Sequence, residues 1–165
     1  MRFHVQYVLI MTASLSMAAC RQADGPIPAP DQTVQEELVD VRRDLQNVAT
    51  GRDPQAPNDL ADDLGKYASR PTAAPTVVEL SRRTAVALPG KNLPDTAAQQ
   101  LAHDLWLSIA AREISERQVE ALQNDVQSLL MSVGVVEEGA RQVAAQVGEV
   151  QSAVTNRPRR WYELF

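Results

Sequence analysis

The chain of 165 residues contains a single cysteine, Cys20, so it cannot form a disulfide within itself. Histidine is almost as scarce, because only His103 lies beyond the first twenty residues. Soft and transition metals need several His, Cys or carboxylate ligands at compatible spacing. The acidic stretch from Asp59 to Asp63 does not follow the spacing of a calcium-binding loop. The sequence therefore predicts neither a metal site nor a cofactor.

Basic residues are fewer than acidic ones: the chain has 16 Lys and Arg and 21 Asp and Glu, which gives a net charge of −5. Affinity for nucleic acid comes mainly from clustered Lys and Arg, so we expect no nucleic-acid partner. Aromatic residues make up only 4% of the chain, and no long stretch alternates apolar and polar residues as strands do. Alanine and leucine abound, and both favour helix. The sequence predicts an all-α protein, with a small helical bundle of about four short helices preceded by a Pro-rich tether and one separate amphipathic helix.

Residues 1–19 have the features of a secretory signal peptide. A basic Arg2 precedes an apolar run shorter than the roughly 20 residues of a membrane span, and small residues close the segment. It ends in Met17-Ala18-Ala19-Cys20, which resembles the lipobox of bacterial lipoproteins, where an aliphatic residue and two small ones precede an obligatory cysteine. Lipoboxes prefer leucine at the position of Met17. The alternatives are an ordinary signal peptide cut near Ala19 and an uncleaved helix with a buried thiol.

The resemblance implies that the sulfur of Cys20 carries a diacylglyceryl group, that the chain is cut before it, and that the new amino group is acylated. Two or three acyl chains anchor a protein durably, whereas one does not. The protein is thus expected in the bacterial cell envelope, bound to the membrane through its N-terminal acyl chains. Arg21 is not the aspartate that retains many enterobacterial lipoproteins at the inner membrane, which favours the outer membrane. Residues 20–32 hold the attachment site and a tether, whose alternating prolines favour an extended polyproline II chain.

Residues 33–50 are predicted to form an amphipathic helix, which begins with a capping box of Thr33 and Glu36 and stops at Gly51. Its apolar residues recur at steps of four, three, four and three. These residues are Val34, Leu38, Val41, Leu45 and Val48. A stripe of about two heptads is too short to predict a coiled coil. The stripe either mediates self-association or packs against the protein's own bundle.

Residues 51–75 are predicted to be a proline-containing linker with one short helical turn that carries Leu60, Leu64 and Tyr67. A helical bundle follows at residues 76–156. Its short loops favour antiparallel neighbours.

Within the bundle, one helix should open with a capping box of Thr76 and Glu79 and end before Pro89. Glu79 lies one turn from Arg83, at the spacing of a helical ion pair. The next helix should be capped by Asp95 and end near residue 111. A further capping box of Ser115 with residue 118 should open the third helix, and the last should run from about 136 to 154.

His103 beside Asp104 is the one pair that could serve acid–base chemistry. Adjacent residues on a helix point about 100° apart, so they are not set to face each other. Ser108 is also poorly placed to act as a nucleophile toward His103. We therefore interpret His103 as a solvated or partly packed surface residue, and the sequence predicts no catalytic residues and no enzyme.

The tail at residues 157–165 combines arginine with large aromatic side chains, a mixture enriched at binding hot spots and at lipid headgroups. The tail residues expected to contact a partner or the membrane are Arg159, Arg160, Trp161, Tyr162 and Phe165. The alternative is that the tail folds back onto the open end of the bundle.

Two functions fit these features. The first is a lipid-anchored, periplasm-facing interaction or structural module with a protein partner. The second is a small periplasmic bundle that binds an apolar or amphiphilic ligand between its helices. The cavity for such a ligand would be lined by Leu101, Leu105, Trp106, Leu122 and Leu129.

Overall fold

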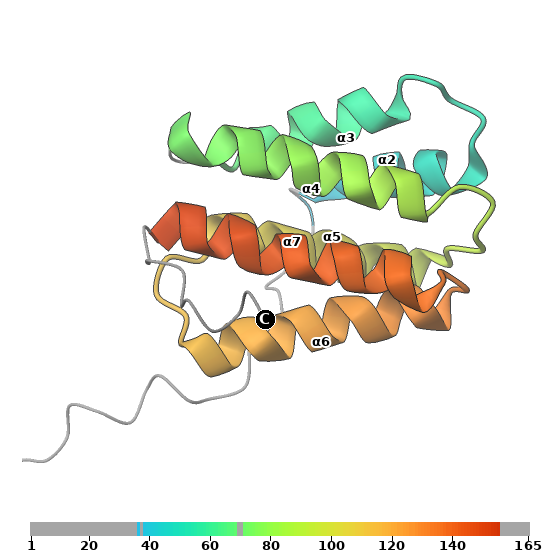
Figure 1. The fold of residues 1–165 in the computed structure, drawn as a ribbon. Coiled ribbons are helices and arrows are strands. Elements are labelled where there is room, and N and C mark those ends of the chain that lie inside the picture. Colours follow the sequence, from blue (N-terminus) through green and yellow to red (C-terminus); the bar gives the residue numbers. More distant parts are fainter. Residues whose placement is uncertain (1–35, 37, 69–70, 156–165) are drawn as a thin grey trace, which may run out of the picture.

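The computed structural model describes residues 36, 38–68 and 71–155 (Figure 1). These residues form six α-helices and one short 3₁₀ helix, with no strand among them. The elements are α2 (Val39–Thr50), α3 (Ala56–Gly65), η1 (Pro71–Ala73), α4 (Ala74–Ala87), α5 (Asp95–Ala110), α6 (Glu116–Ser132) and α7 (Glu137–Thr155). The all-α class is confirmed for this part of the chain, which has six α-helices where about four in a bundle and one separate helix were predicted.

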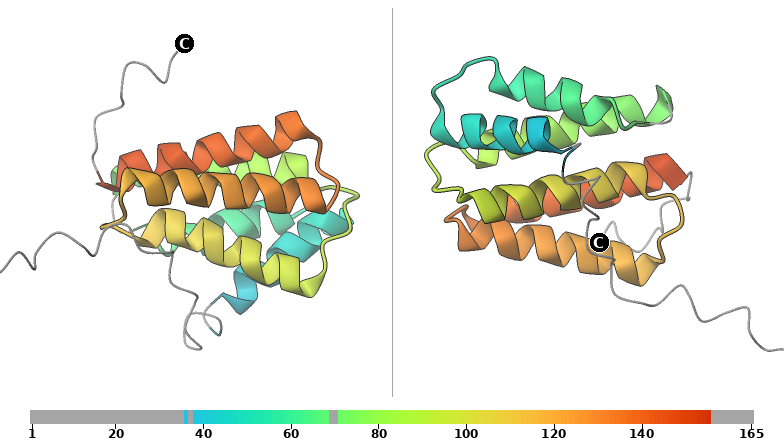
Figure 2. Two further views of the ribbon diagram at one scale, coloured as in Figure 1. Left: turned by 90° about the horizontal axis from the view of Figure 1, so that it is seen from below. Right: turned by 180° about the vertical axis from the view of Figure 1, so that it is seen from behind.

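The helices are arranged in two groups of three (Figures 1 and 2). In Figure 1, α2, α3 and α4 lie above, and α5, α6 and α7 lie below. The longest helix, α7, packs against α6, α4 and α5, and α2 reaches across to α5. Helices α6 and α7 run antiparallel, as their short connection predicts. Contacts of α4 with α7 and of α2 with α5 therefore join the two groups.

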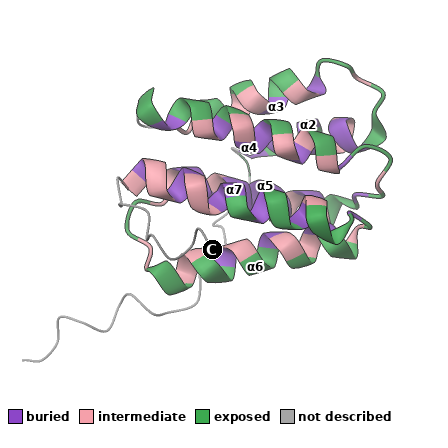
Figure 3. Ribbon diagram, in the orientation of Figure 1, coloured by how far each residue is buried: buried purple, intermediate pink, exposed green. Residues whose placement is uncertain are grey.

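A single apolar core runs through both groups of helices, and Figure 3 shows the buried residues on the faces between them. The stripe of α2 belongs to it, because Leu38, Val41, Leu45 and Val48 are all buried. Val34 lies outside the described residues. The amphipathic helix is thus not separate: in this structure its stripe packs against the protein's own bundle.

The segment predicted to be a linker contributes a whole helix to this core. Helix α3 has ten residues, and its Leu60 and Leu64 are fully buried. Pro57 lies in its first turn, where the missing N–H group costs no hydrogen bond. The prediction of one short helical turn was therefore wrong, because a proline at a helix start was interpreted as a loop.

Two of the predicted helix ends are confirmed. Gly51 ends α2 with a left-handed φ of 63°. At the start of α6 the N–H of Gln118 donates to Ser115 Oγ at 3.3 Å, and the N–H of Ser115 donates to Gln118 Oε1 at 2.9 Å. This is the reciprocal pair that defines a capping box.

Two helix starts differ from prediction. Helix α4 begins two residues earlier than Thr76, with Pro75 in its first turn, and the Thr76 hydroxyl donates to the carbonyl of Ala73 at 2.7 Å. The predicted capping box of Thr76 and Glu79 was therefore wrong. At α5 the residue before the helix is Pro94, so Asp95 is the first helical residue and makes no side-chain cap. The predicted box at Thr33 lies outside the described residues.

Candidate functional site

A pocket of about 520 Å³ opens between the C-terminal half of α4, the loop that follows it and the N-terminal turns of α7. Three cationic side chains line it, Arg82 and Arg83 from α4 and Lys91 from the loop. None of its ten described lining residues is acidic. In a chain with a net charge of −5, the pocket is a local concentration of positive charge.

Two glycines set the backbone that shapes the pocket. Gly134 ends α6 at φ 90°, and the N–H groups of Gly134 and Val135 donate to the carbonyls of Met131 and Leu130 at 3.0 Å. This Schellman arrangement turns the chain sharply into α7.

On the other wall of the pocket, Gly90 has a φ of 73° and donates its N–H to the carbonyl of Ala49 at the end of α2. The N–H of Lys91 donates to the carbonyl of Leu88 at 2.9 Å. The backbone that carries the Lys91 ammonium is therefore held by two hydrogen bonds.

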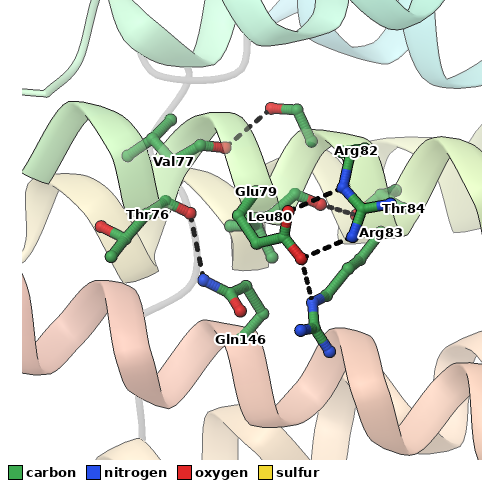
Figure 4. Close-up of polar contacts among 9 residues, drawn as sticks. Thr76, Val77, Glu79, Leu80, Arg82, Arg83, Thr84 and Gln146 are labelled. Carbon is green, nitrogen blue, oxygen red and sulfur yellow. Dashed lines mark hydrogen bonds and ion pairs between the residues drawn. The ribbon is translucent and has the colours of Figure 1, made fainter.

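Glu79 orders the two arginines (Figure 4). Its carboxylate accepts two hydrogen bonds from Arg82 and one from Nε of Arg83, each at 2.7 Å. The hydrogen bonds from Arg82 first, and then from Arg83, lower the pKa of Glu79 from 4.5 to about 2. The ion pair with Arg83 confirms the prediction made from their spacing.

The rest of the Arg83 guanidinium extends from α4 toward α7, as Figure 4 shows. The terminal nitrogens of Arg83 make no other hydrogen bond within the described part of the chain. The three cations that line the pocket and the carboxylate of Glu79 that binds two of them together carry a charge of +2.

The remaining walls supply apolar surface and one amide. Val86 and Val136 line the pocket and are 71% and 69% exposed, the two highest values among the large apolar residues described. Gln142 donates its Nε2 to Glu138 at 2.9 Å, and its Oε1 has no partner among the described residues. The pocket can therefore accept an anionic group, an apolar side chain and an N–H donor together.

The structure corrects the interpretation of His103. Both His103 and Asp104 are only 3% exposed, and Nδ1 of the histidine lies 3.5 Å from Oδ1 of the aspartate. The His103 ring stacks on Trp106 at 5.9 Å between centroids, and Gln100 donates to Asp104 at 2.8 Å. Burial raises the pKa of Asp104, against a smaller opposing effect of His103. The prediction of a surface histidine was wrong because α5 is covered on more than one side.

Ser108 completes this part of α5. It is fully buried and donates its hydroxyl to the carbonyl of Leu105 at 2.6 Å. Acid–base or nucleophilic chemistry needs a substrate within reach of the group, and these side chains are closed off from solvent. We therefore assign His103, Asp104 and Ser108 to the interior of the fold.

The residues predicted to line a ligand cavity between helices lie in or against the core. Leu101, Leu105 and Leu122 are fully buried in it, and Trp106 and Leu129 pack against it partly buried. The 520 Å³ pocket lies elsewhere, at the α4–α7 end of the bundle. Sequence reasoning missed this pocket, because its basic residues form no motif and its two walls are about 45 positions apart.

The other predicted site residues lie outside the described residues. They are Met17, Ala18, Ala19 and Cys20 at the N-terminus and Arg159, Arg160, Trp161, Tyr162 and Phe165 in the tail. None of the helices that the structure describes is both long enough and apolar enough to span a bilayer. No set of three or more His, Cys, Asp or Glu in residues 36, 38–68 and 71–155 is placed to hold a metal ion.

Comparisons with protein-family models, with curated proteins and with solved structures find no match to this chain.

Proposed function

We propose that this protein is a lipid-anchored helical interaction module of the bacterial cell envelope. In this proposal Cys20 carries the acyl chains, residues 20–32 act as a proline-rich tether, and the helical domain faces the periplasm. The outer membrane is its expected location. The tail at residues 157–165 supplies a second surface for a partner or for lipid headgroups.

Binding rather than catalysis is supported above all by the chemistry of the pocket between α4 and α7. Its lining combines guanidinium, ammonium, amide and valine side chains, groups that recognise charge and apolar surface. The nucleophilic and acid–base side chains of α5 are buried instead. The bundle thus has a cationic pocket at one end, while the candidate catalytic side chains of α5 lie in its interior.

The anchor is supported by the sequence Met17-Ala18-Ala19-Cys20 and by the prolines that follow it. A thioether can form only on a thiol, and the lipobox resemblance implies that cleavage follows lipid transfer. In the native bacterial host, Cys20→Ser should leave the precursor uncleaved or cut elsewhere. The helical domain should still fold, because residues 39–155 contain their own core.

Mass spectrometry of the purified protein tests this proposal. We expect the wild-type chain to begin at Cys20 with an added diacylglyceryl mass and to sediment with membranes. The control, Arg21→Gln, should be cut and lipidated in the same way, since it leaves the lipobox intact. An unmodified wild-type N-terminus at any other residue would make the protein a soluble secreted module and remove the anchor.

A further inference from the structure

We propose that the pocket between α4 and α7 binds the free C-terminal carboxylate of a peptide whose last side chain is apolar. This inference rests on the interaction role proposed above and names the chemistry of the partner. It does not depend on the lipid anchor, so each proposal can fail without the other.

The positive charge of the pocket favours a carboxylate. Glu79 holds Arg83 through its Nε and thereby orders the side chain before any ligand arrives. The terminal nitrogens of Arg83 are left to donate, and planar guanidinium groups bind carboxylates with two parallel hydrogen bonds. Lys91, on the loop that follows α4, supplies a second positive charge. Together with Arg82 and after subtraction of the Glu79 carboxylate, these cations carry a charge of +2, which favours an anion.

Glu137 and Glu138 lie in the first turn of α7, next to the lining residues Val136 and Gly139. Glu138 is bound by Arg141 and Gln142, and the hydrogen bonds from Gln142 and Arg141 lower the pKa of Glu138. Glu138 is paired with Arg141, so Glu137 alone reduces the charge, from +2 to +1.

Beside its cations, the pocket also offers apolar surface and a hydrogen-bond acceptor. Val86 of α4 and Val136, the residue before α7, line the pocket and lie exposed. The unpaired Oε1 of Gln142 can accept an N–H group. A peptide terminus offers all three complements together: the carboxylate, an apolar side chain and a backbone N–H. Inorganic phosphate offers only the charge, and a fatty acid lacks the N–H donor.

The volume agrees with this class of ligand. Ligand pockets in proteins commonly measure about 300–1,000 Å³, and the 520 Å³ found here falls within that range and leaves room for the end of a peptide. A ligand of that size with one charged contact should bind with a Kd on the order of 1 mM.

The test uses the full chain, purified in nonionic detergent micelles and labelled with ¹⁵N, and two probes. One is N-acetyl-Ala-Val with a free carboxylate, and the other is the same dipeptide as its C-terminal amide. We expect the acid to shift the backbone amides of Lys91, Val136 and Gly139 and to bind at least about tenfold more tightly than the amide form, since the charge-assisted contact is lost.

Two variants and one control test whether the acid dipeptide binds at this pocket. Arg83→Gln and Lys91→Gln should each weaken binding of the acid by about tenfold. Arg112→Gln removes an exposed arginine near the opposite end of α7 and should change nothing. Because Lys91 lies in a loop and is not one of the core residues, its variant remains informative if Arg83→Gln fails to fold.

Three results would overturn the inference. The first is equal binding of the acid and the amide, and the second is the absence of shifts at the three amides. The third is displacement of the dipeptide by inorganic phosphate at equal concentration, which would make this a site for bare anions. Binding of the acid by a protein that carries no lipid would support the inference while contradicting the anchor.

Discussion

Asp44 of α2 is the group whose replacement should most clearly stabilise this protein at neutral pH. Its side chain is buried, and Oδ2 has no hydrogen-bond donor among the described residues. Asp63 and Asp59 of α3 add negative charge beside it, and Arg43 offsets this only in part. Burial, followed by the charge and a hydrogen bond of Asp63, raises the pKa of Asp44 from 3.8 to about 6.

The direction of the pH effect on stability depends on whether the folded or the unfolded protein binds the Asp44 proton more tightly. The folded protein binds the Asp44 proton more strongly than the unfolded chain, so the stabilisation is complete below pH 3.8 and is lost as the pH rises through about 6. The difference between these pKa values corresponds to at most about 3 kcal/mol. Water and side-chain relaxation around the Asp44–Asp63 pair should reduce it to about 1–2 kcal/mol.

Asp44→Asn removes the charge and keeps the shape of the side chain. At pH 7 we expect it to raise the free energy of unfolding by about 1–2 kcal/mol, and at pH 3.5 to change it little. Glu79, whose pKa is lowered to about 2, makes the opposite contribution below pH 4.5, and it is common to both proteins. The difference between them therefore isolates Asp44.

Urea denaturation followed by far-ultraviolet circular dichroism at pH 3.5, 5 and 7 measures this difference. Asp62→Asn makes the same chemical change on the exposed side of α3 and should show no such pH dependence. If Asp44→Asn is not more stable at pH 7, or if its gain is the same at all three pH values, the assignment of a buried, shared proton is refuted.

Two further substitutions test the packing of α7. Gln151 donates its Nε2 to the carbonyls of Ser108 and Ala111 at 2.8 and 2.9 Å; Gln151→Leu should lower the free energy of unfolding by about 2–3 kcal/mol, and an unchanged melting curve would contradict this. A Cβ on Gly148 would lie 2.6 Å from Nε2 of Gln123, so Gly148→Ala should be nearly neutral alone but stabilising by about 1 kcal/mol in a Gln123→Ala background. Additive effects in this double-mutant cycle would show that the two residues do not interact.

The sequence predicts the helices best where apolar periodicity and end signals agree. Helix α6 shows this, because its capping box at Ser115 and its end before Gly134 are both found. Prediction fails where the end signals compete. Pro57 and Pro75 both belong to the segment predicted to be a linker, and each lies in the first turn of a helix. A proline fits a first turn as well as a loop, and only the packing of Leu60 and its neighbours distinguishes the two.

Burial of polar residues could not be predicted from a single helix. A polar face is normally solvated, and on that basis the sequence predicts His103 at the surface, although the structure buries it on α5. That helix contacts α2, α6 and α7, and the positions of these neighbours depend on contacts far apart in the chain. The burial of Gln151 could not be predicted for the same reason, because its amide packs against the end of another helix, α5. One signal was present, since a glutamine inside a valine-rich stripe must find partners when the stripe is buried.

The pocket could not be predicted for a different reason: none of its residues, taken alone, differs from what is typical of its helix or loop. Arg82 and Arg83 are typical of an exposed helical face, and Lys91 is typical of a loop. They gain a common role only because α7 packs along α4 and the turn at Gly134 brings exposed Val136 to the same end. The protein as a whole is negatively charged, but the surface where the end of α4 meets the start of α7 is positive. The local charge, rather than the net charge, decides which ligand binds there. Raising the salt concentration should therefore weaken the carboxylate contact at this pocket, despite the overall negative charge of the protein.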